Sequence, residues 1–149
     1  MLSFDFPTQM LEEGCVKFSA PSLGAFKKAA WEYAPSKAPV FYNPVMELNR
    51  DLAVLALQAY QKTVKRDIVL CEPLAGCGVR GIRCAKEVKG VQRVVLNDIN
   101  PIAADLARHN VKLNQLSAHA LVFNEDANLL LSRYAAPHRR FDFVDVDPF

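Results

Sequence analysis

One glycine-rich segment limits the folds open to this chain more than any other feature. It reads EPLAGCGVRG from Glu72 to Gly81, follows an apolar stretch at 67–71 and precedes residues with helical spacing. A strand, a glycine turn and a helix in this order form one unit of an α/β sheet, whose helix N-terminus is suited to a nucleotide ligand. The glycines also match the dinucleotide pattern G-x-G-x-x-G, which has an acidic residue, here Asp98, about twenty positions further on.

From residue 43 onward, strand-like and helix-like segments alternate along the chain. The apolar runs predict strands at 67–71, 93–96, 120–123 and 141–146. Helical spacing predicts helices at 43–63, 79–88, 100–113 and 127–134. This alternation predicts a parallel, doubly wound sheet of the Rossmann-like α/β class, with the ligand at the carboxyl ends of the strands.

The pattern divides the chain into two parts. Residues 1–42 are punctuated by prolines, and we expect an irregular segment there, with a short strand at 16–19 and a helix at 23–33. Residues 43–149 hold the regular part, which stops directly after the fourth predicted strand. A doubly wound sheet needs further strands and helices to cover its other half, so we expect a truncated domain from a longer protein.

Composition excludes several classes of protein. The net charge is +2, so any nucleic-acid site needs a local cluster of basic residues. Lys27, Lys28 and Lys37 lie close in sequence to Trp31 and Tyr33, a mixture that suits an RNA-facing surface and equally a solvated helix. The chain has no apolar run of about eighteen residues and no signal-peptide pattern, so a cytoplasmic location is expected. The four cysteines lack the paired spacing of zinc ligands, and no metal site is predicted.

Glu72 distinguishes between two nucleotide cofactors. In a dinucleotide site the first glycine follows the strand directly, whereas here Glu72 and three further residues come first. A carboxylate repels a pyrophosphate but suits S-adenosylmethionine, which carries a sulfonium and an ammonium group. Gly76 and Gly78 let the backbone approach such a ligand, because no Cβ stands in the way. The segment therefore favours S-adenosylmethionine, and NAD remains the alternative.

Two acidic residues follow the next strands at the same edge of the sheet. Asp98 ends the second predicted strand, where a carboxylate can accept both hydroxyl protons of a ribose. Asp126 follows the third strand, where an acid can accept from the adenine amino group while the N–H of Ala127 meets a ring nitrogen. The alternative for both aspartates is a helix cap.

Three arginines are candidates for the methionine carboxylate of the cofactor. Arg50 lies on the helix before the sheet, and Arg80 and Arg83 lie on the helix after the glycine segment. A planar guanidinium matches a carboxylate with two parallel hydrogen bonds. Solvation at the surface is the alternative for each of them.

Asp147-Pro148-Phe149 ends the fourth predicted strand and is the predicted reaction site. An exocyclic amine of a nucleobase is a poor nucleophile, because its lone pair is delocalised. Asp147 can accept a hydrogen bond from such an amine, orient its lone pair and take its proton. Phe149 offers a face on which the base can stack. An ordinary turn at the end of a strand is the alternative.

Six segments of the chain together resemble the tRNA (guanine-26-N2)-dimethyltransferases. They are FYNPVMELNRD at 41–51, GCGVRGIR at 76–83, LNDIN at 96–100, NVKLN at 110–114, DAN at 126–128 and DVDPF at 145–149. The resemblance implies a class I S-adenosylmethionine-dependent methyltransferase that adds one or two methyl groups to the N2 amine of guanine 26 in tRNA. A guanine stacked within the tRNA must be flipped out, and the resemblance implies a pocket for it beside Phe149.

The same resemblance assigns roles to individual residues. Asp147 is implied to be catalytic, and Arg80 is an alternative to Arg83 for the cofactor. The implied cofactor contacts are Arg50, Arg83, Asp98, Asp126 and Ala127. Since the family continues past residue 149, we expect this chain alone to have little or no activity. Two other functions stay open, an NAD-binding oxidoreductase domain and a non-catalytic tRNA-binding module.

Overall fold

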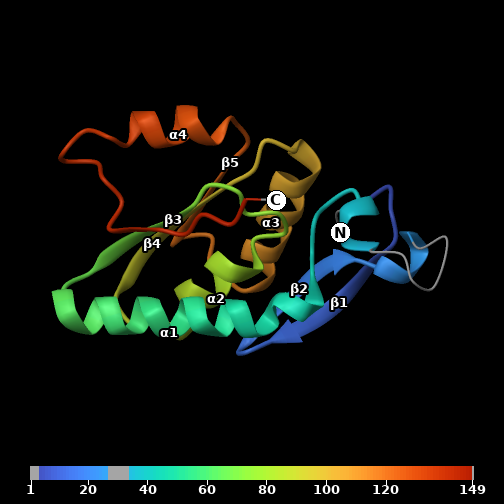
Figure 1. Ribbon diagram of the computed structural model, residues 1–149, viewed down its shortest axis with the longest axis horizontal. Helices are drawn as coiled ribbons and strands as arrows, with labels where there is room; N and C mark the ends of the chain where they lie inside the picture. The colour runs from blue at the N-terminus through green and yellow to red at the C-terminus, as the bar shows by residue number, and fades with distance from the viewer. Residues whose placement is uncertain (1–3, 27–33, 149) are drawn as a thin grey trace.

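A four-stranded parallel sheet with helices on both faces forms the centre of the computed structural model, which describes residues 4–26 and 34–148 (Figure 1). The strands are β3 (Ile68–Glu72), β4 (Val91–Asn97), β5 (Ala120–Phe123) and β6 (Phe143–Val144). They lie in the order β5-β4-β3-β6, and every neighbouring pair is parallel. The predicted parallel α/β sheet is therefore confirmed.

Four α-helices cover the two faces of this sheet. They are α1 (Glu47–Val64), α2 (Val79–Glu87), α3 (Pro101–Leu113) and α4 (Ala127–Arg133). Leu70 and Leu96 point into a large core that α1, α2 and α3 share, whereas Cys71 and Val95 pack with Leu130 of α4 on the other face. Successive strand residues point to opposite faces, so these apolar strands are buried on both sides, as a doubly wound sheet requires.

Asparagine caps set the start of two of these helical segments. The Asn43 side chain accepts from the N–H of Val45, and a 3₁₀ turn over Pro44–Met46 leads into α1. The single helix expected from residue 43 thus begins with a tighter turn. The Asn100 side chain accepts in the same way from Ile102, 3.0 Å away, at the start of α3. Both caps satisfy N–H groups that the first helical turn leaves without partners.

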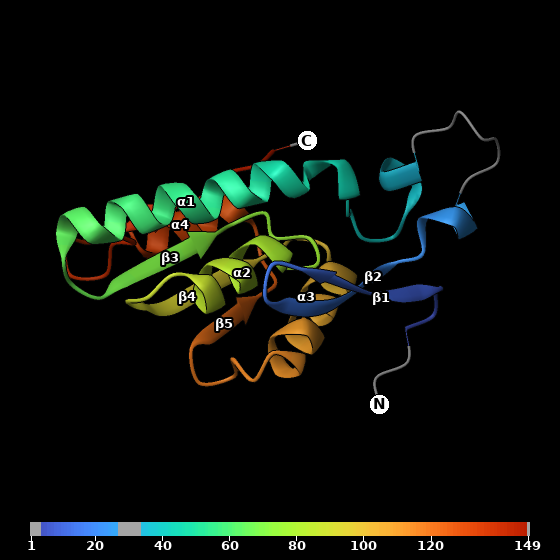
Figure 2. The same ribbon diagram turned by 90° about the horizontal axis from the view of Figure 1, so that it is seen from below.

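The N-terminal segment forms an antiparallel hairpin of β1 (Thr8–Glu13) and β2 (Val16–Pro21). Figures 1 and 2 both show this hairpin beside α3. The strand expected at 16–19 is present and longer, and β1 was not expected. The helix expected at 23–33 is replaced at its start by a 3₁₀ turn over Leu23–Phe26, and residues 27–33 lie outside the described residues.

Side-chain amides of α3 hold the hairpin on the sheet domain. Asn110 accepts from the N–H of Ser19 at 2.7 Å and donates to its carbonyl oxygen at 2.9 Å. Asn114 makes the same pair of contacts with Lys17. Phe18 of β2 is fully buried in the core that α2 and α3 line. The hairpin is therefore packed as part of the same core.

Within the described ranges 4–26 and 34–148, no helix is both long enough and apolar enough to cross a lipid bilayer.

Candidate functional site

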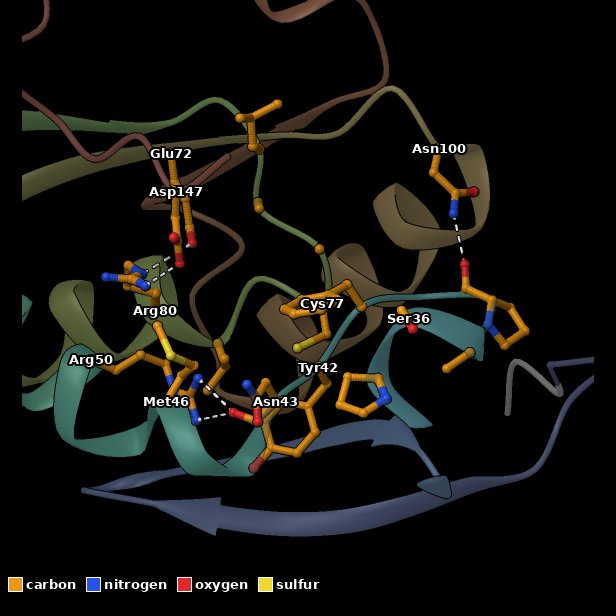
Figure 3. Close-up of a pocket in the computed structure, with 18 residues that line it drawn as sticks. Ser36, Tyr42, Asn43, Met46, Arg50, Glu72, Cys77, Arg80, Asn100 and Asp147 are labelled. Atoms are coloured by element: carbon orange, nitrogen blue, oxygen red, sulfur yellow. Dashed lines mark hydrogen bonds and ion pairs between the residues drawn. The ribbon is translucent and has the colours of Figure 1, made fainter. Parts of the chain in front are cut away.

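A cavity of about 600 Å³ lies at the carboxyl ends of the strands, between the glycine segment and the segment at 35–50 (Figure 3). Glu72, Gly76 and Arg80 line it on the sheet side. Tyr42 and Arg50 line it on the side of the N-terminal segment. Asn100 and Asp147 complete the lining from the ends of later strands. The cavity is therefore at the edge of the sheet where the sequence predicted a ligand.

The glycine segment folds back under the N-terminal segment through positive backbone angles. Gly76 has φ 55° and Gly78 has φ 79°, a region that side-chain-bearing residues rarely adopt. A Cβ on Gly76 would lie 3.0 Å from the carbonyl oxygen of Phe41, so the two segments approach as closely as a glycine allows. Asp98 holds this turn, because its Oδ2 accepts from the N–H of Gly76 at 2.8 Å.

Three carboxylates surround a single guanidinium at the sheet side of the cavity. Arg80 Nη2 lies 2.6 Å from Asp147, Nη1 lies 3.6 Å from Asp145, and Nε lies 3.9 Å from Glu72. Figure 3 shows Glu72, Asp147 and Arg80 pointing toward one another. One positive charge faces three acidic groups, so a second positive charge bound beside them would be electrostatically stabilised.

Burial changes the acidity of two members of this cluster. Desolvation, with a smaller contribution from the nearby Asp145, raises the pKa of Glu72 to about 8, although Arg80 and the N–H of Gly81 oppose the rise. Desolvation also raises the pKa of Asp145, against the effect of Arg80. At neutral pH the Glu72 carboxyl is therefore mostly protonated even beside Arg80, and a further cation in the cavity would favour its ionised form.

The structure places Arg80 and Arg83 in different surroundings. Arg80 lines the cavity, whereas Arg83 is outside its lining and lies in an ion-pair cluster with Glu87 and Asp51 at 2.9 and 2.6 Å. The Arg83 side chain is 4% exposed. Between the two arginines that the sequence left open, Arg80 is the one at the cavity.

Asp98, Asp126 and Ala127 are not in the cavity lining: Asp98 directly follows β4, and Asp126 and Ala127 lie where the chain passes from β5 into α4. Asp126 Oδ1 accepts from the N–H groups of Asn128 and Leu129 and caps α4, as one alternative had it. Asp98 also caps a turn, because its Oδ1 accepts from the N–H of Asn100. Phe149, the predicted stacking residue, lies outside the described residues.

Several residues of the site carried no role in the sequence interpretation. Glu13 and Tyr42 form a buried group with Arg50, described below. Asn97, 1% exposed, donates to the carbonyl oxygens of Pro73 and Glu125 and so joins the loops after β3 and β5. A polar residue at the end of an apolar strand was the available signal for Asn97. No local signal pointed to Glu13.

The cysteines are free thiols, and three of them are buried. Burial raises the pKa of Cys71, Cys77 and Cys84 to about 12 in each case, so they stay protonated and unreactive at neutral pH. Across residues 4–26 and 34–148, no group of three or more His, Cys, Asp or Glu side chains is arranged to hold a metal ion.

Known proteins resemble this chain over nearly its whole length. The model of the family described as N2,N2-dimethylguanosine tRNA methyltransferase matches residues 21–149. The tRNA (guanine(26)-N(2))-dimethyltransferase of Methanosphaera stadtmanae is 43% identical over 142 residues, which are 95% of this chain and 33% of that protein. The protein of the same name from Pyrobaculum arsenaticum is 47% identical over 137 residues, with 92% and 35% covered. The chain thus spans about a third of the length of the curated relatives it matches.

A solved structure gives the same result. The structure of Trm1 from Pyrococcus horikoshii with S-adenosyl-L-methionine superposes with a TM-score of 0.70 and 30% identity, over 95% of this chain and 36% of that one. An S-adenosylmethionine-dependent methyltransferase from Agrobacterium tumefaciens superposes with a TM-score of 0.66 at 21% identity, which bears on the fold alone. Taken with the family model, these matches show that the chain belongs to the N2,N2-dimethylguanosine tRNA methyltransferase family.

Proposed function

We propose that this chain binds S-adenosylmethionine in the cavity at the strand ends and forms the cofactor-binding part of a tRNA (guanine-26-N2)-dimethyltransferase. The observation that carries the proposal is the cluster of Glu72, Asp145 and Asp147 around the single cation of Arg80. Such a cluster suits a ligand with a sulfonium and an ammonium group and disfavours a pyrophosphate. The names of the relatives and the cofactor bound to the Pyrococcus protein support the same assignment.

The residues around the cavity fit the different parts of this cofactor. Glu72 faces the cationic groups, and Arg50 and Arg80 supply guanidinium groups for the methionine carboxylate. Asp98 would accept from the ribose hydroxyls; each of its oxygens already accepts one backbone N–H and keeps a second lone pair for this purpose. Asp126 and the N–H of Ala127 would meet the adenine, while Gly76, which lines the cavity, would admit the ligand close to the backbone. Gly78 instead faces the core, where an added Cβ would meet Leu96 and Ala107.

Asp147 is the residue that we assign to proton transfer. The bound cofactor supplies an electrophilic methyl group. The Asp147 carboxylate, 38% exposed, accepts a hydrogen bond from the N2 amine of the guanine and orients its lone pair. As the C–N bond forms, the bond between the methyl group and sulfur would break and leave a neutral thioether, and the proton released by the cationic amine would pass to Asp147. Phe149 would stack on the flipped guanine.

The substrate and the extent of activity belong to the same proposal. The substrate is tRNA, the location is cytoplasmic, and no metal takes part. Because the chain spans about a third of its curated relatives, we propose that it holds the cofactor side and transfers few or no methyl groups on its own.

Two measurements on the purified 149-residue chain test this function. Ligand-detected NMR or calorimetry should show binding of S-adenosylhomocysteine, and NADH at the same concentration should not compete. Preferential binding of NADH would instead support the oxidoreductase alternative. Incubation with radiolabelled S-adenosylmethionine and a tRNA transcript should give little labelled tRNA, and robust labelling would show that the chain is an active enzyme by itself.

A further inference from the structure

We propose that Glu13, at the end of β1, is a positioning residue of the cofactor cavity that sets the affinity for the amino-acid end of the ligand. The inference rests on the function proposed above. Glu13 is outside the cavity lining, and it acts through Arg50 and Tyr42, which both line it. The N-terminal hairpin would then belong to the binding site and not only to the fold.

The Glu13 carboxylate holds Arg50 in a bidentate pair. Oε2 accepts from Arg50 Nε at 2.7 Å, and Oε1 accepts from Arg50 Nη2 at 2.5 Å. The two side chains are only 2% and 5% exposed, so water does not screen the pair. A buried bidentate pair fixes the plane of a guanidinium far more strictly than a pair at the surface does.

The remaining donors of Arg50 are nearly all used. Nη1 and Nη2 each donate to the carbonyl oxygen of Asn43 at 3.2 Å, contacts that Figure 3 shows as dashed lines. A guanidinium has five N–H groups, and these contacts together with the Glu13 pair occupy four of them. One N–H, on Nη1, is left for a ligand in the cavity. By accepting from Nε and Nη2, Glu13 therefore determines that the free donor of Arg50 is an N–H on Nη1.

Glu13 fixes a second wall residue at the same time. The Tyr42 hydroxyl donates to Glu13 Oε1 at 2.9 Å, and the Arg50 guanidinium carbon lies 5.4 Å from the centre of the Tyr42 ring. Burial and the Glu13 carboxylate raise the pKa of the Tyr42 phenol, so it stays a hydrogen-bond donor at all ordinary pH values. Arg50 is thus held at its edge by Glu13 and stacked on its face by Tyr42.

The hairpin that carries Glu13 is itself tied to the glycine segment. Asn110 of α3 bonds both Ser19 in β2 and the carbonyl oxygen of Cys77, at 2.9 Å each from its Nδ2. Cys77 also lines the cavity. One helix side chain therefore fixes the hairpin relative to the glycine segment, and Glu13 fixes the hairpin relative to the N-terminal wall.

Two ligands that differ at one end test the proposal. S-adenosylhomocysteine carries the amino-acid carboxylate, and 5′-methylthioadenosine lacks the amino-acid portion. In the 149-residue chain, Glu13→Gln should raise the Kd for S-adenosylhomocysteine by about tenfold, because a charged hydrogen-bond pair is lost, and that for methylthioadenosine by less than about twofold. Glu12→Gln is the matched control: Glu12 is the preceding residue, 67% exposed and paired with Lys17, and its substitution should change neither value.

The outcomes separate the inference from the function on which it rests. Equal weakening of both ligands would mean that Glu13 only stabilises the fold, and unchanged binding would mean that it does not position Arg50; either result overturns the inference and leaves the function standing. If the unsubstituted chain binds neither ligand, the proposed function fails first. If Glu13→Gln does not fold, Glu13→Asp takes its place, since it keeps the charge but moves it back by one methylene group. It too should weaken the binding of S-adenosylhomocysteine more than that of methylthioadenosine.

A double substitution gives an independent check. Arg50→Lys keeps the charge but not the bidentate geometry. It should therefore also weaken the binding of S-adenosylhomocysteine while leaving that of methylthioadenosine nearly unchanged. Adding Glu13→Gln to Arg50→Lys should then raise the Kd by less than about twofold further, because the two residues act as one unit. Fully additive effects would show that Glu13 does not act through Arg50.

Discussion

Arg80 Nη2 lies 2.6 Å from the carboxylate of Asp147, and this contact joins the first helix after the glycine segment to the last strand end of the sheet. The two residues are 67 positions apart in the sequence. Arg80 is 9% exposed and Asp147 is 38% exposed, so the pair runs from the interior to the mouth of the cavity. The residue proposed to take the proton is therefore held by a residue proposed to bind the cofactor.

Arg80→Ala should destabilise the chain in a pH-dependent way. Without the guanidinium, Asp145 and Asp147 lose their cationic partner and repel each other, and we expect the free energy of unfolding at pH 7 to fall by about 2 kcal/mol, less than for a fully buried pair because Asp147 is partly solvated. The loss should be smaller at pH 5, because the raised pKa of Asp145 leaves more of that carboxyl protonated there. Urea denaturation at both pH values measures it.

Arg108→Ala is the control for Arg80→Ala. Arg108 pairs with Asp105 at 2.7 Å, but the two side chains are 40% and 60% exposed. Its removal should cost less than about 0.5 kcal/mol at either pH. Equal effects of the two substitutions would contradict a special role of Arg80 among the carboxylates.

Glu72 should make the chain less stable as the pH rises toward 8. The folded-state pKa of Glu72 is raised to about 8 from an ordinary value of 4.5, so the folded chain holds a proton that the unfolded chain has released. The stabilisation is complete below pH 4.5 and is lost as the pH rises to about 8. In Glu72→Gln, the decrease in the free energy of unfolding over this pH range should be smaller by at least about 1.4 kcal/mol, the equivalent of one pKa unit.

Thermal or urea unfolding across this pH range measures the slope. Glu12→Gln, at an exposed position, should leave the slope as it is in the unsubstituted chain. Asp145 also has a raised pKa and stays in place, so part of the slope should remain in Glu72→Gln. A slope unchanged by Glu72→Gln would mean that Glu72 is ionised in the folded chain.

The sequence predicted the sheet well because its strands are short, mostly apolar runs. The strand expected at 120–123 coincides with β5, and the helix expected from Asn100 ends at Leu113 as predicted. Continuous apolar runs between cap residues carry enough local information for this. β6 is shorter than the expected 141–146, because only Phe143 and Val144 pair with β3.

The N-terminal hairpin was harder to predict because its stability comes from distant contacts. β1 reads TQMLEE, its first three residues are exposed, and its pairing with β2 leaves little apolar pattern. The same applies to Glu13, whose partners Tyr42 and Arg50 lie 29 and 37 positions away. Spacing also left Arg80 and Arg83 undecided, because residues three apart share one helix face and only tertiary contacts separate them.

Asn97→Ala should loosen the loops on both sides of β4. The Asn97 amide donates to Pro73 and Glu125 at 2.9 and 3.0 Å, and its Oδ1 accepts from the N–H of Glu125 at 3.2 Å. Removing it leaves buried backbone groups without partners, at a cost of about 2 kcal/mol. Asn97→Asp should cost more, because a carboxylate would face two carbonyl oxygens. Urea denaturation measures both, with the exposed Asn128→Ala as a control that should be near neutral.

Gly81→Ala gives the sharpest test of how the glycine segment is packed. In an exposed helix a glycine-to-alanine change stabilises by about 1 kcal/mol. At Gly81, however, an added Cβ would lie 2.4 Å from Leu96 Cδ2 and 2.8 Å from Glu72 Oε2, which accepts from the Gly81 N–H at 2.9 Å. We therefore expect a net loss of about 1–2 kcal/mol, since overpacking outweighs the helical preference.

The displacement of Glu72 should also weaken ligand binding in Gly81→Ala. The matched control is Gly24→Ala, because a Cβ at Gly24 would meet no heavy atom within 4 Å. Urea denaturation and S-adenosylhomocysteine titration of both variants should show losses for Gly81→Ala alone. If Gly81→Ala were as stable as the unsubstituted chain and bound the ligand equally well, α2 could move away from β4 at no cost. In that case the close packing of α2 on β4 would not require a glycine at position 81. The position of Glu72 would not depend on this close packing either.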